Sequence, residues 1–278
     1  SLLEDKNLIV APGVFDGLSA LLAKQANFPV LYASGGAIAR SFGYPDLGLL
    51  TLTEVCSVVA NIVAITQLPI IADADTGFGN VLNVRRTVQE FERIGVAAIH
   101  IEDQTFPKRC GHLNDKSIIS CAEMCNKIAI AKQSLTKKEM LIIARTDAIA
   151  VEGFDAALAR AEAYQTAGAD MIFIEAPETV AQIETIASRI QGYKLINMFH
   201  GGKTPVIPTV RLQELGYNVV IIPSDLQRAA IKSIQKTLAA IHLHGNSEQM
   251  AEELTSFKER ELIVGTAEYL ALNAQVLI

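Results

Sequence analysis

Residues 96–112 read Val96-Ala97-Ala98-Ile99-His100-Ile101-Glu102-Asp103-Gln104-Thr105-Phe106-Pro107-Lys108-Arg109-Cys110-Gly111-His112. The first six form a mainly apolar run, which is typical of a strand buried on both faces of a parallel sheet. The segment then turns polar and supplies two carboxylates, two cations, a thiol and an imidazole. Pro107 and Gly111 mark the polar part as a loop rather than a helix. The pattern predicts a buried strand that delivers reactive side chains at its carboxyl end.

The thiol of Cys110 has Lys108, Arg109 and His112 as near neighbours in the sequence. Nearby positive charge favours the thiolate form of a cysteine, so we expect this thiol to be reactive. The alternative is a solvated surface loop that carries a cysteine by chance. His100 lies inside the strand, where we expect a hydrogen-bonded core histidine.

Composition limits the classes of protein to consider. The 278 residues are 50% hydrophobic and 19% charged, which suits one large domain or two ordinary ones. The net charge of −6 disfavours nucleic acid as a partner, because such binding needs a basic face. We also expect no membrane span, because no apolar run reaches about 18 residues. The first six residues show no signal-peptide pattern and the cysteines have no metal-finger spacing. We therefore expect a cytoplasmic protein, or one of an organelle matrix if a leader has been removed.

Strand and helix patterns alternate eight times along the chain. Strands are expected near 8–11, 30–33, 69–72, 96–101, 140–144, 171–174, 194–197 and 218–222. Helices are expected near 17–25, 52–66, 84–94, 122–133, 154–167, 180–190, 210–215 and 225–242. Such alternation is typical of βα units around a parallel sheet, and eight units predict an α/β fold, a (β/α)8 TIM barrel.

After residue 245 the strand pattern stops. Two helices are expected at about 247–260 and 266–275, and the second is apolar with no strand to cover. We predict a single (β/α)8 barrel domain over residues 1–278, with 246–278 as a C-terminal helical tail. Its apolar side chains should pack on the barrel or on another subunit.

Six successive strands end in polar groups. These are Ser34-Gly35-Gly36, Asp73-Ala74-Asp75, Glu102-Asp103, Arg145-Thr146-Asp147, Glu175 and Asn197. Active sites of such barrels lie at the carboxyl ends of the strands. One such residue could be a hydrogen-bonded turn cap, but the recurrence at six strands predicts an active site there.

The types of polar group indicate a hard metal ion and an anionic ligand. Asp73, Asp75 and Glu102 are oxygen donors on neighbouring strands, and the chain offers no cage of histidines and cysteines. This combination suits Mg²⁺, with Mn²⁺ as a substitute, in a shell that retains several waters. Alternatively, the two aspartates cap the amides of the glycine turn that follows. Arg145 ends a buried strand and needs an anion to offset its desolvation, either Glu175 or a substrate carboxylate.

Several motifs together resemble those of the isocitrate lyase and phosphoenolpyruvate mutase superfamily, over nearly the whole chain. They are Ser34-Gly35-Gly36, Pro45-Asp46-Leu47-Gly48, residues 73–79, residues 101–104, Lys108-Arg109-Cys110-Gly111-His112, residues 144–147, and residues 197–205. The segment 108–112 is similar to the lyase branch, which cleaves carbon–carbon bonds. The resemblance implies a Mg²⁺-dependent barrel whose eighth helix is exchanged between subunits, usually in a homotetramer.

The resemblance also implies roles for individual residues. Asp73 would hold Mg²⁺ directly or through water, and three carboxylates would act through water, namely Asp75, Glu102 and Asp46. The oxygen atoms of a small dicarboxylate substrate would be held by Ser34, Gly35, Gly36, Arg145, Glu175 and Asn197.

The implied reaction is a retro-aldol cleavage of a 2-hydroxy dicarboxylate, of the 2,3-dimethylmalate or 2-methylisocitrate type, into a 2-oxo acid and a carboxylate. Tyr32 or a metal-bound water is the candidate base. Lys108, Arg109 and His112 would stabilise the enolate that departs. Cys110 would protonate the enolate carbon as a general acid.

Two departures leave other functions open. His200 stands where many relatives carry a glutamate. The hydrolases of the family are expected to place a serine near the end of strand eight, where this chain has Pro223 and Ser224. If Pro223 is the equivalent position, a lyase is favoured. The alternatives are an oxaloacetate hydrolase that gives oxalate and acetate, and a catalytically silent barrel that binds a metabolite or a partner.

Overall fold

The computed structural model of the chain describes residues 2–4, 7–111, 115–137 and 139–275. Eight parallel strands close into a barrel in sequence order, and β8 pairs with β1. The strands are β1 (Ile9–Val14), β2 (Leu31–Ala33), β3 (Ile70–Asp73), β4 (Ala98–Glu102), β5 (Leu141–Thr146), β6 (Met171–Ile174), β7 (Tyr193–Asn197) and β8 (Val219–Ile222). The predicted (β/α)8 barrel is confirmed.

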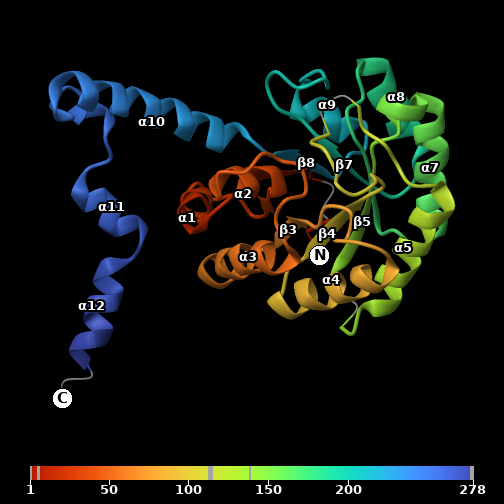
Figure 1. The fold of residues 1–278 in the computed structure, drawn as a ribbon, viewed down its shortest axis with the longest axis horizontal. Helices are drawn as coiled ribbons and strands as arrows, with labels where there is room; N and C mark the ends of the chain where they lie inside the picture. The colour runs from red at the N-terminus through yellow and green to blue at the C-terminus, as the bar shows by residue number, and fades with distance from the viewer. Residues whose placement is uncertain (1, 5–6, 112–114, 138, 276–278) are drawn as a thin grey trace.

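Helices follow the strands and surround the barrel (Figure 1). They are α1 (Gly17–Gln25), α2 (Gly35–Ser41), α3 (Leu52–Thr66), α4 (Val81–Ile94), α5 (Cys121–Ser134), α6 (Ile149–Glu152), α7 (Phe154–Thr166), α8 (Val180–Arg189), α9 (Thr209–Glu214), α10 (Asp225–His244), the 3₁₀ helix η1 (Glu248–Glu253), α11 (Phe257–Ile263) and α12 (Thr266–Gln275). Among the described helices, none carries an apolar stretch long enough to span a bilayer.

Each strand has one face inside the barrel and one against the helices. Side chains two residues apart share a face, so the interior series on β4 runs Ala98, His100, Glu102. The lower part of the barrel interior is apolar and contains residues such as Ile143 and Phe173. Towards the carboxyl ends the same faces become charged. This periodicity brings Glu102 of β4 beside Arg145 of β5 in the strand register.

The helix α2 was not expected from the sequence, because two consecutive glycines disfavour a helix. It forms because Ser34 caps its first turn by accepting a hydrogen bond from the amide of Ala37, and because Ala37 and Ile38 are buried. The helix begins directly after β2. It therefore fixes Gly35 and Gly36 at the carboxyl end of the barrel.

The single helix expected over 247–260 is wrong. The chain forms η1, passes through an extended Leu254, and begins α11 at Ser256. Ser256 and Glu259 make a reciprocal capping box at the start of α11, a local signal that favours a new helix over a continued one.

The helix α10 runs out from the barrel, and α11 and α12 continue beyond it (Figure 1). Its first turn is anchored, because the buried Gln227 donates a hydrogen bond to the carbonyl oxygen of Ala37. Further along, Ile234 and Leu238 are more than half exposed. An apolar groove of about 660 Å³ lies between α1 and α10 and reaches β1 and β8.

Candidate active site

A cavity of about 360 Å³ opens at the carboxyl ends of the strands. Many of the residues that the sequence predicts for the site line it: Tyr32, Ser34, Gly36, Asp46, Asp73, Lys108, Cys110, Arg145, Glu175 and Asn197. Gly35, Asp75 and Glu102 lie beside or beneath this lining, and each contacts one of its residues. The barrel therefore brings side chains from β2, β3, β5, β6 and β7 to one place.

One side of the cavity is a carboxylate cluster that contains a single ammonium group. The amino group of Lys108 forms a short ion pair with Asp46 and lies 2.8 Å from Oδ1 of Asp75. The Lys108 side chain is only 4% exposed. Burial raises the pKa of Asp75 to about 6, even though Lys108 acts to lower it. The charge of Lys108 alone thus does not offset the free-energy cost of burying these carboxylates in their charged form.

Asp73 stands at the centre of this cluster and is held from three directions. It accepts a hydrogen bond from the Tyr32 hydroxyl at 3.3 Å and from the Asp75 amide at 3.0 Å. His100 Nε2 lies 3.5 Å from Asp73 Oδ1 and 2.9 Å from the Tyr32 hydroxyl. Burial alone would raise the pKa of Asp73, but the His100 imidazole, the cations Lys108 and Arg145 and the hydrogen bond from the Asp75 amide lower it to about 2. Asp73 is therefore an anion at neutral pH.

The environment of Asp73 constrains its two aromatic neighbours. Burial and the Asp73 charge raise the pKa of Tyr32 well above its ordinary value. Burial lowers the pKa of His100 to about 4, against the influence of Asp73. Both groups are neutral at pH 7. The phenol of Tyr32 is consequently a hydrogen-bond donor rather than a ready base.

Glu102 is buried below the cluster and lacks a full set of partners. Its side chain is 1% exposed, and neither carboxylate oxygen has a hydrogen-bond partner among the described residues. Arg145 Nε is 3.2 Å from Oε2. Burial raises the pKa of Glu102 well above its ordinary value, although Arg145 and Lys108 act to lower it.

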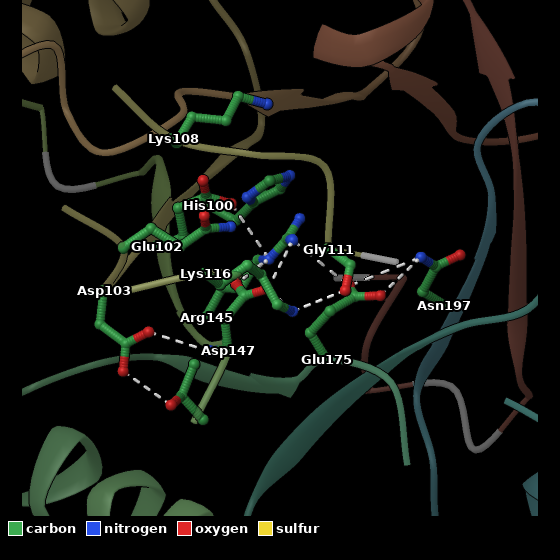
Figure 2. Close-up of polar contacts among 12 residues, drawn as sticks. His100, Glu102, Asp103, Lys108, Gly111, Lys116, Arg145, Asp147, Glu175 and Asn197 are labelled. Atoms are coloured by element: carbon green, nitrogen blue, oxygen red, sulfur yellow. Dashed lines mark hydrogen bonds and ion pairs between the residues drawn. The ribbon is translucent and has the colours of Figure 1, made fainter. Parts of the chain in front are cut away.

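Figure 2 shows the guanidinium of Arg145 among three carboxylates. Besides Glu102, Asp147 Oδ2 lies 2.9 Å from its Nε, and Glu175 Oε2 lies 3.7 Å from Nη2. Asn197 donates to Glu175 Oε1 at 3.2 Å. The Arg145 side chain is 9% exposed and still faces the cavity, so it can present donors to an anionic ligand.

A buried network supports this cluster from behind. The carboxylate of Asp103 accepts hydrogen bonds from the Thr146 hydroxyl at 2.7 Å, the Asp147 amide at 2.9 Å and the Tyr164 hydroxyl at 2.7 Å. Arg160 approaches the same carboxylate at 3.5 Å. Asp103 therefore fixes the backbone on which Asp147 stands, without facing the cavity.

Two glycines allow the carboxylates to approach the backbone. A Cβ atom added at Gly35 would lie 2.6 Å from Asp73 Oδ2, and one at Gly36 would lie 2.7 Å from Asp46 Oδ2. Any side chain at either position would displace a carboxylate. The glycine pair is thus required by close packing.

The loop after β4 brings Cys110 to the cavity. The Gln104 amide group bonds both the amide nitrogen of Arg109, at 2.9 Å, and its carbonyl oxygen, at 2.7 Å. We expected Arg109 to line the cavity, but it does not. Its side chain is 46% exposed and lies 3.6 Å from Asp115, because the loop backbone turns it outward. His112 lies outside the described residues.

His100 is a buried, hydrogen-bonded histidine, as the sequence indicated. Its contact with Asp73 was not foreseen, although the period of two places His100 on the interior face of β4 with Glu102. Other residues of the site were missed by the sequence interpretation. Lys116 ion-pairs with Asp147 at 2.7 Å, and no sequence pattern signals this contact. Three apolar residues that also line the cavity had no signal in the sequence: Phe199, Ile221 and Ile231.

Comparison with known proteins agrees with this arrangement. The family model described as phosphoenolpyruvate phosphomutase matches residues 1–242. A 2-methylisocitrate lyase of Aeropyrum pernix is 42% identical over 275 residues, which are 99% of this chain and 89% of that protein. A 2,3-dimethylmalate lyase of Eubacterium barkeri is 41% identical over 265 residues, which are 95% of this chain and 92% of that protein.

Several solved structures are also similar to this chain over nearly its whole length. A crystal structure of 2,3-dimethylmalate lyase has a TM-score of 0.93 at 34% identity and covers 99% of this chain and 92% of that chain. A structure of oxaloacetate acetylhydrolase with 3,3-difluorooxalacetate has a TM-score of 0.93 at 31% identity, with coverage of 99% and 94%. A phosphonopyruvate hydrolase complex with oxalate and Mg²⁺ has a TM-score of 0.90 at 29% identity, with coverage of 100% and 97%.

The raised pKa of Asp75 leads to a prediction about stability. In excess chelator, its charged form opposes folding above pH 6, and this cost disappears below about pH 4, where the carboxyl is protonated in both folded and unfolded chains. Asp75→Asn should therefore stabilise the chelated protein at pH 8 by about 1–3 kcal/mol. The difference should shrink towards pH 4.5. Thermal unfolding at both pH values checks it, and a variant less stable than wild type at pH 8 would contradict the assignment.

Proposed function

This chain belongs to the phosphoenolpyruvate phosphomutase family, within the isocitrate lyase and phosphoenolpyruvate mutase superfamily, and we propose that it is a Mg²⁺-dependent carbon–carbon lyase. The proposed substrate is a small 2-hydroxy dicarboxylate of the 2,3-dimethylmalate or 2-methylisocitrate type. The observation that carries the proposal is the position of Cys110, which lines the same cavity as Asp73 and Arg145. An acid, an anion-binding cation and a carboxylate cluster are the groups that this cleavage needs.

The carboxylate cluster fits a divalent cation held mainly through water. Among the residues that the structure describes, the carboxylate oxygens of Glu102 have no hydrogen-bond partner, and Asp75 and Asp46 share the ammonium of Lys108. Among the described residues, no three histidine, cysteine, aspartate or glutamate side chains lie close enough to hold an ion directly. The proposed ion would take most of its ligands from water. When bound there, Mg²⁺ would supply positive charge to the oxygens of the 2-oxo acid fragment.

The charged half of the cavity would hold the substrate. Arg145 presents its guanidinium to a carboxylate, and Asn197 and Glu175 lie beside it. Ser34 and Gly36 line the neighbouring rim, and we assign them to the oxygens of the 2-oxo acid part. The apolar residues of the lining, Phe199, Ile221, Pro223 and Ile231, offer hydrophobic contact to methyl substituents, which are present in both proposed substrate types.

In the proposed reaction, the substrate hydroxyl loses its proton and the adjacent carbon–carbon bond breaks. The electron pair of that bond remains on the departing fragment, which becomes an enolate. The high pKa of Tyr32 disfavours it as the base. We assign the proton transfer to a water held by the carboxylate cluster, which passes the proton on to a carboxylate. The Cys110 thiol then donates its proton to the enolate carbon. Stabilisation of the enolate charge by Lys108, Arg109 and His112 stays a prediction for all three. In the structure Lys108 is paired with Asp46 and Asp75.

One observation favours the hydrolase alternative. Ser224 lines the cavity, and its buried hydroxyl has no hydrogen-bond partner among the described residues. A serine near the end of β8 is the feature expected of the oxaloacetate hydrolases. Pro223 lines the cavity beside it, so both positions face the ligand. Release of oxalate and acetate from oxaloacetate, with no cleavage of 2-hydroxy dicarboxylates, would select this alternative.

The outer face of the barrel supports assembly with other copies. The eighth helix, α10, leaves an apolar groove over β1 and β8 instead of covering it. The exposed face of α10 carries Ile231, Ile234 and Leu238. We assign the groove to the α10 helix of a second copy, in a homo-oligomer that we propose to be a tetramer. From the sequence, we still expect this protein to lie in the cytoplasm.

The activity and its metal requirement are tested together. Purified protein with Mg²⁺ should cleave one of 2-methylisocitrate, 2,3-dimethylmalate or citramalate, as measured by release of the 2-oxo acid. Excess chelator should abolish turnover, because the buried carboxylates then lack a counter-charge, and Mg²⁺ or Mn²⁺ should restore it. Full turnover in excess chelator would exclude the metal assignment.

The role of Cys110 is tested by Cys110→Ser. Serine is nearly isosteric but much less acidic, so turnover should fall by at least ~10²-fold while substrate affinity is largely kept. Cys121→Ser, at the start of α5, is the matched control and should retain wild-type turnover. Steady-state kinetics and a binding measurement decide. Turnover of Cys110→Ser within about threefold of wild type would remove this thiol from the mechanism.

Assembly is tested by light scattering at micromolar concentration. We expect the mass of a homo-oligomer for wild type. Leu238→Glu places a charge on the apolar face of α10, where the side chain is 59% exposed, and should shift the protein to smaller species. Leu82→Glu on α4, where the side chain is 74% exposed, should leave the mass unchanged. A monomeric wild type would refute the proposed assembly.

A further inference from the structure

Lys116 is a buried cation that the proposed reaction does not use. Its amino group lies 2.7 Å from Asp147 Oδ1 and 2.6 Å from the carbonyl oxygen of Gly111, and its side chain is 1% exposed. Burying an ammonium group is costly unless charged and polar partners surround it. Here one partner stands at the end of β5 and the other belongs to the loop that carries Cys110. Lys116 therefore connects the loop to the barrel.

We propose that Lys116 is a positioning residue that seats Cys110 and Gly111 over the substrate site. The proposal rests on the lyase function argued above, because it assigns Lys116 to the placement of the acid. In this role Lys116 neither binds the substrate nor transfers the proton.

The barrel end of this connection is shared with the anion-binding arginine. Asp147 accepts from Arg145 Nε at 2.9 Å through Oδ2 and from Arg145 Nη2 at 3.3 Å through Oδ1, the oxygen that also bonds Lys116. Figure 2 shows Lys116 and Arg145 converging on this group. Asp103 holds the amide of Asp147 at 2.9 Å. Lys116 is thus tied to a fixed point beside the substrate site.

The loop end is tied where the backbone has no free space. A Cβ atom added at Gly111 would lie 2.5 Å from Arg145 Nη2 and 2.7 Å from Glu175 Cγ. The Gly111 backbone therefore rests directly on two substrate-site residues. The hydrogen bond from Lys116 holds the Gly111 carbonyl in this position. Because Cys110 is the preceding residue, the same bond limits where its thiol can lie.

A second tie acts further along the loop. Gln104 bonds the backbone of Arg109, and an antiparallel bridge between Gln104 and Ile118 closes the base of the loop. These contacts hold the loop to its own stem. Lys116 instead links it to Asp147, so its loss should release the Cys110 end of the loop while the base remains paired.

The main test is Lys116→Met, which keeps the length of the side chain and removes its charge. Lys132→Met is the matched control, because Lys132 also pairs with an aspartate, Asp170, at 2.7 Å, but on α5 outside the site. Three quantities are compared with wild type: the rate at which iodoacetamide alkylates Cys110, mapped by peptide mass spectrometry, the steady-state constants on the best substrate, and the melting temperature.

For Lys116→Met we expect faster alkylation of Cys110 and a kcat lowered by about 10- to 100-fold, the size of effect expected for a lost charged hydrogen bond. KM should stay within about threefold of wild type, because the substrate contacts remain. Lys132→Met should match wild type in alkylation and kcat. Lys116→Arg keeps the charge and should recover part of kcat. If Lys116→Met does not fold, Lys116→Gln retains a donor for the Gly111 carbonyl and should show the same changes in weaker form.

Wild-type alkylation of Cys110 together with wild-type kcat in Lys116→Met would overturn the proposal. So would a lowered melting temperature with unchanged kcat, which would make Lys116 a residue of stability alone. The alkylation measurement needs no turnover. If wild type cleaves none of the substrates, the proposed function fails, and faster alkylation in Lys116→Met still shows that Lys116 seats the loop.

Discussion

The charge of Arg145 is the constraint on which the site depends. A guanidinium does not lose its proton in a protein, so its burial at the end of β5 requires carboxylates around it. Glu102 comes from β4, Asp147 from the end of β5 and Glu175 from the end of β6. Two of these carboxylates have a further partner, because Asn197 donates to Glu175 and Lys116 pairs with Asp147. The carboxyl ends of four neighbouring strands are joined through one cation.

The other half of the cavity also holds more carboxylates than cations. Asp46 and Asp75 share the ammonium of Lys108, and Asp73 relies on Tyr32 and His100, which are neutral. A fold selected for stability alone would not bury so many carboxylates with so few cations. The raised pKa of Asp75 records the cost of this arrangement. The imbalance is the physical reason why a divalent cation suits this half of the cavity.

The sequence predicted the barrel and the edge that bears the site, because both follow from burial and strand period. Continuous apolar runs identify strands with two buried faces, and polar residues at their carboxyl ends identify the edge. Local geometry was less accessible. Two glycines concealed the helix that begins at Gly35, because a cap and buried neighbours outweigh their poor helix propensity.

Loop positions were the least predictable part of the site. The neighbours of Cys110 in sequence suggested a thiol among cations, but Lys108 is taken up by two carboxylates and Arg109 turns outward. The contact of Lys116 with Asp147 joins residues 31 positions apart, and nothing in the spacing signals it. Such contacts depend on how a loop folds back on the barrel. Hydrophobic periodicity identifies strands and helices, but it does not predict the path of a loop.

The departure of α10 from its own barrel also bears on how the molecule unfolds. A groove over β1 and β8 and the apolar face of α10 are both left uncovered by the described residues of one chain. In the assembly proposed above, part of the hydrophobic burial that holds each barrel together is supplied by another molecule. The free energy of unfolding then contains a mass-action term, so the melting temperature rises with protein concentration. Dilution alone would weaken the fold, with no change in sequence, pH or metal.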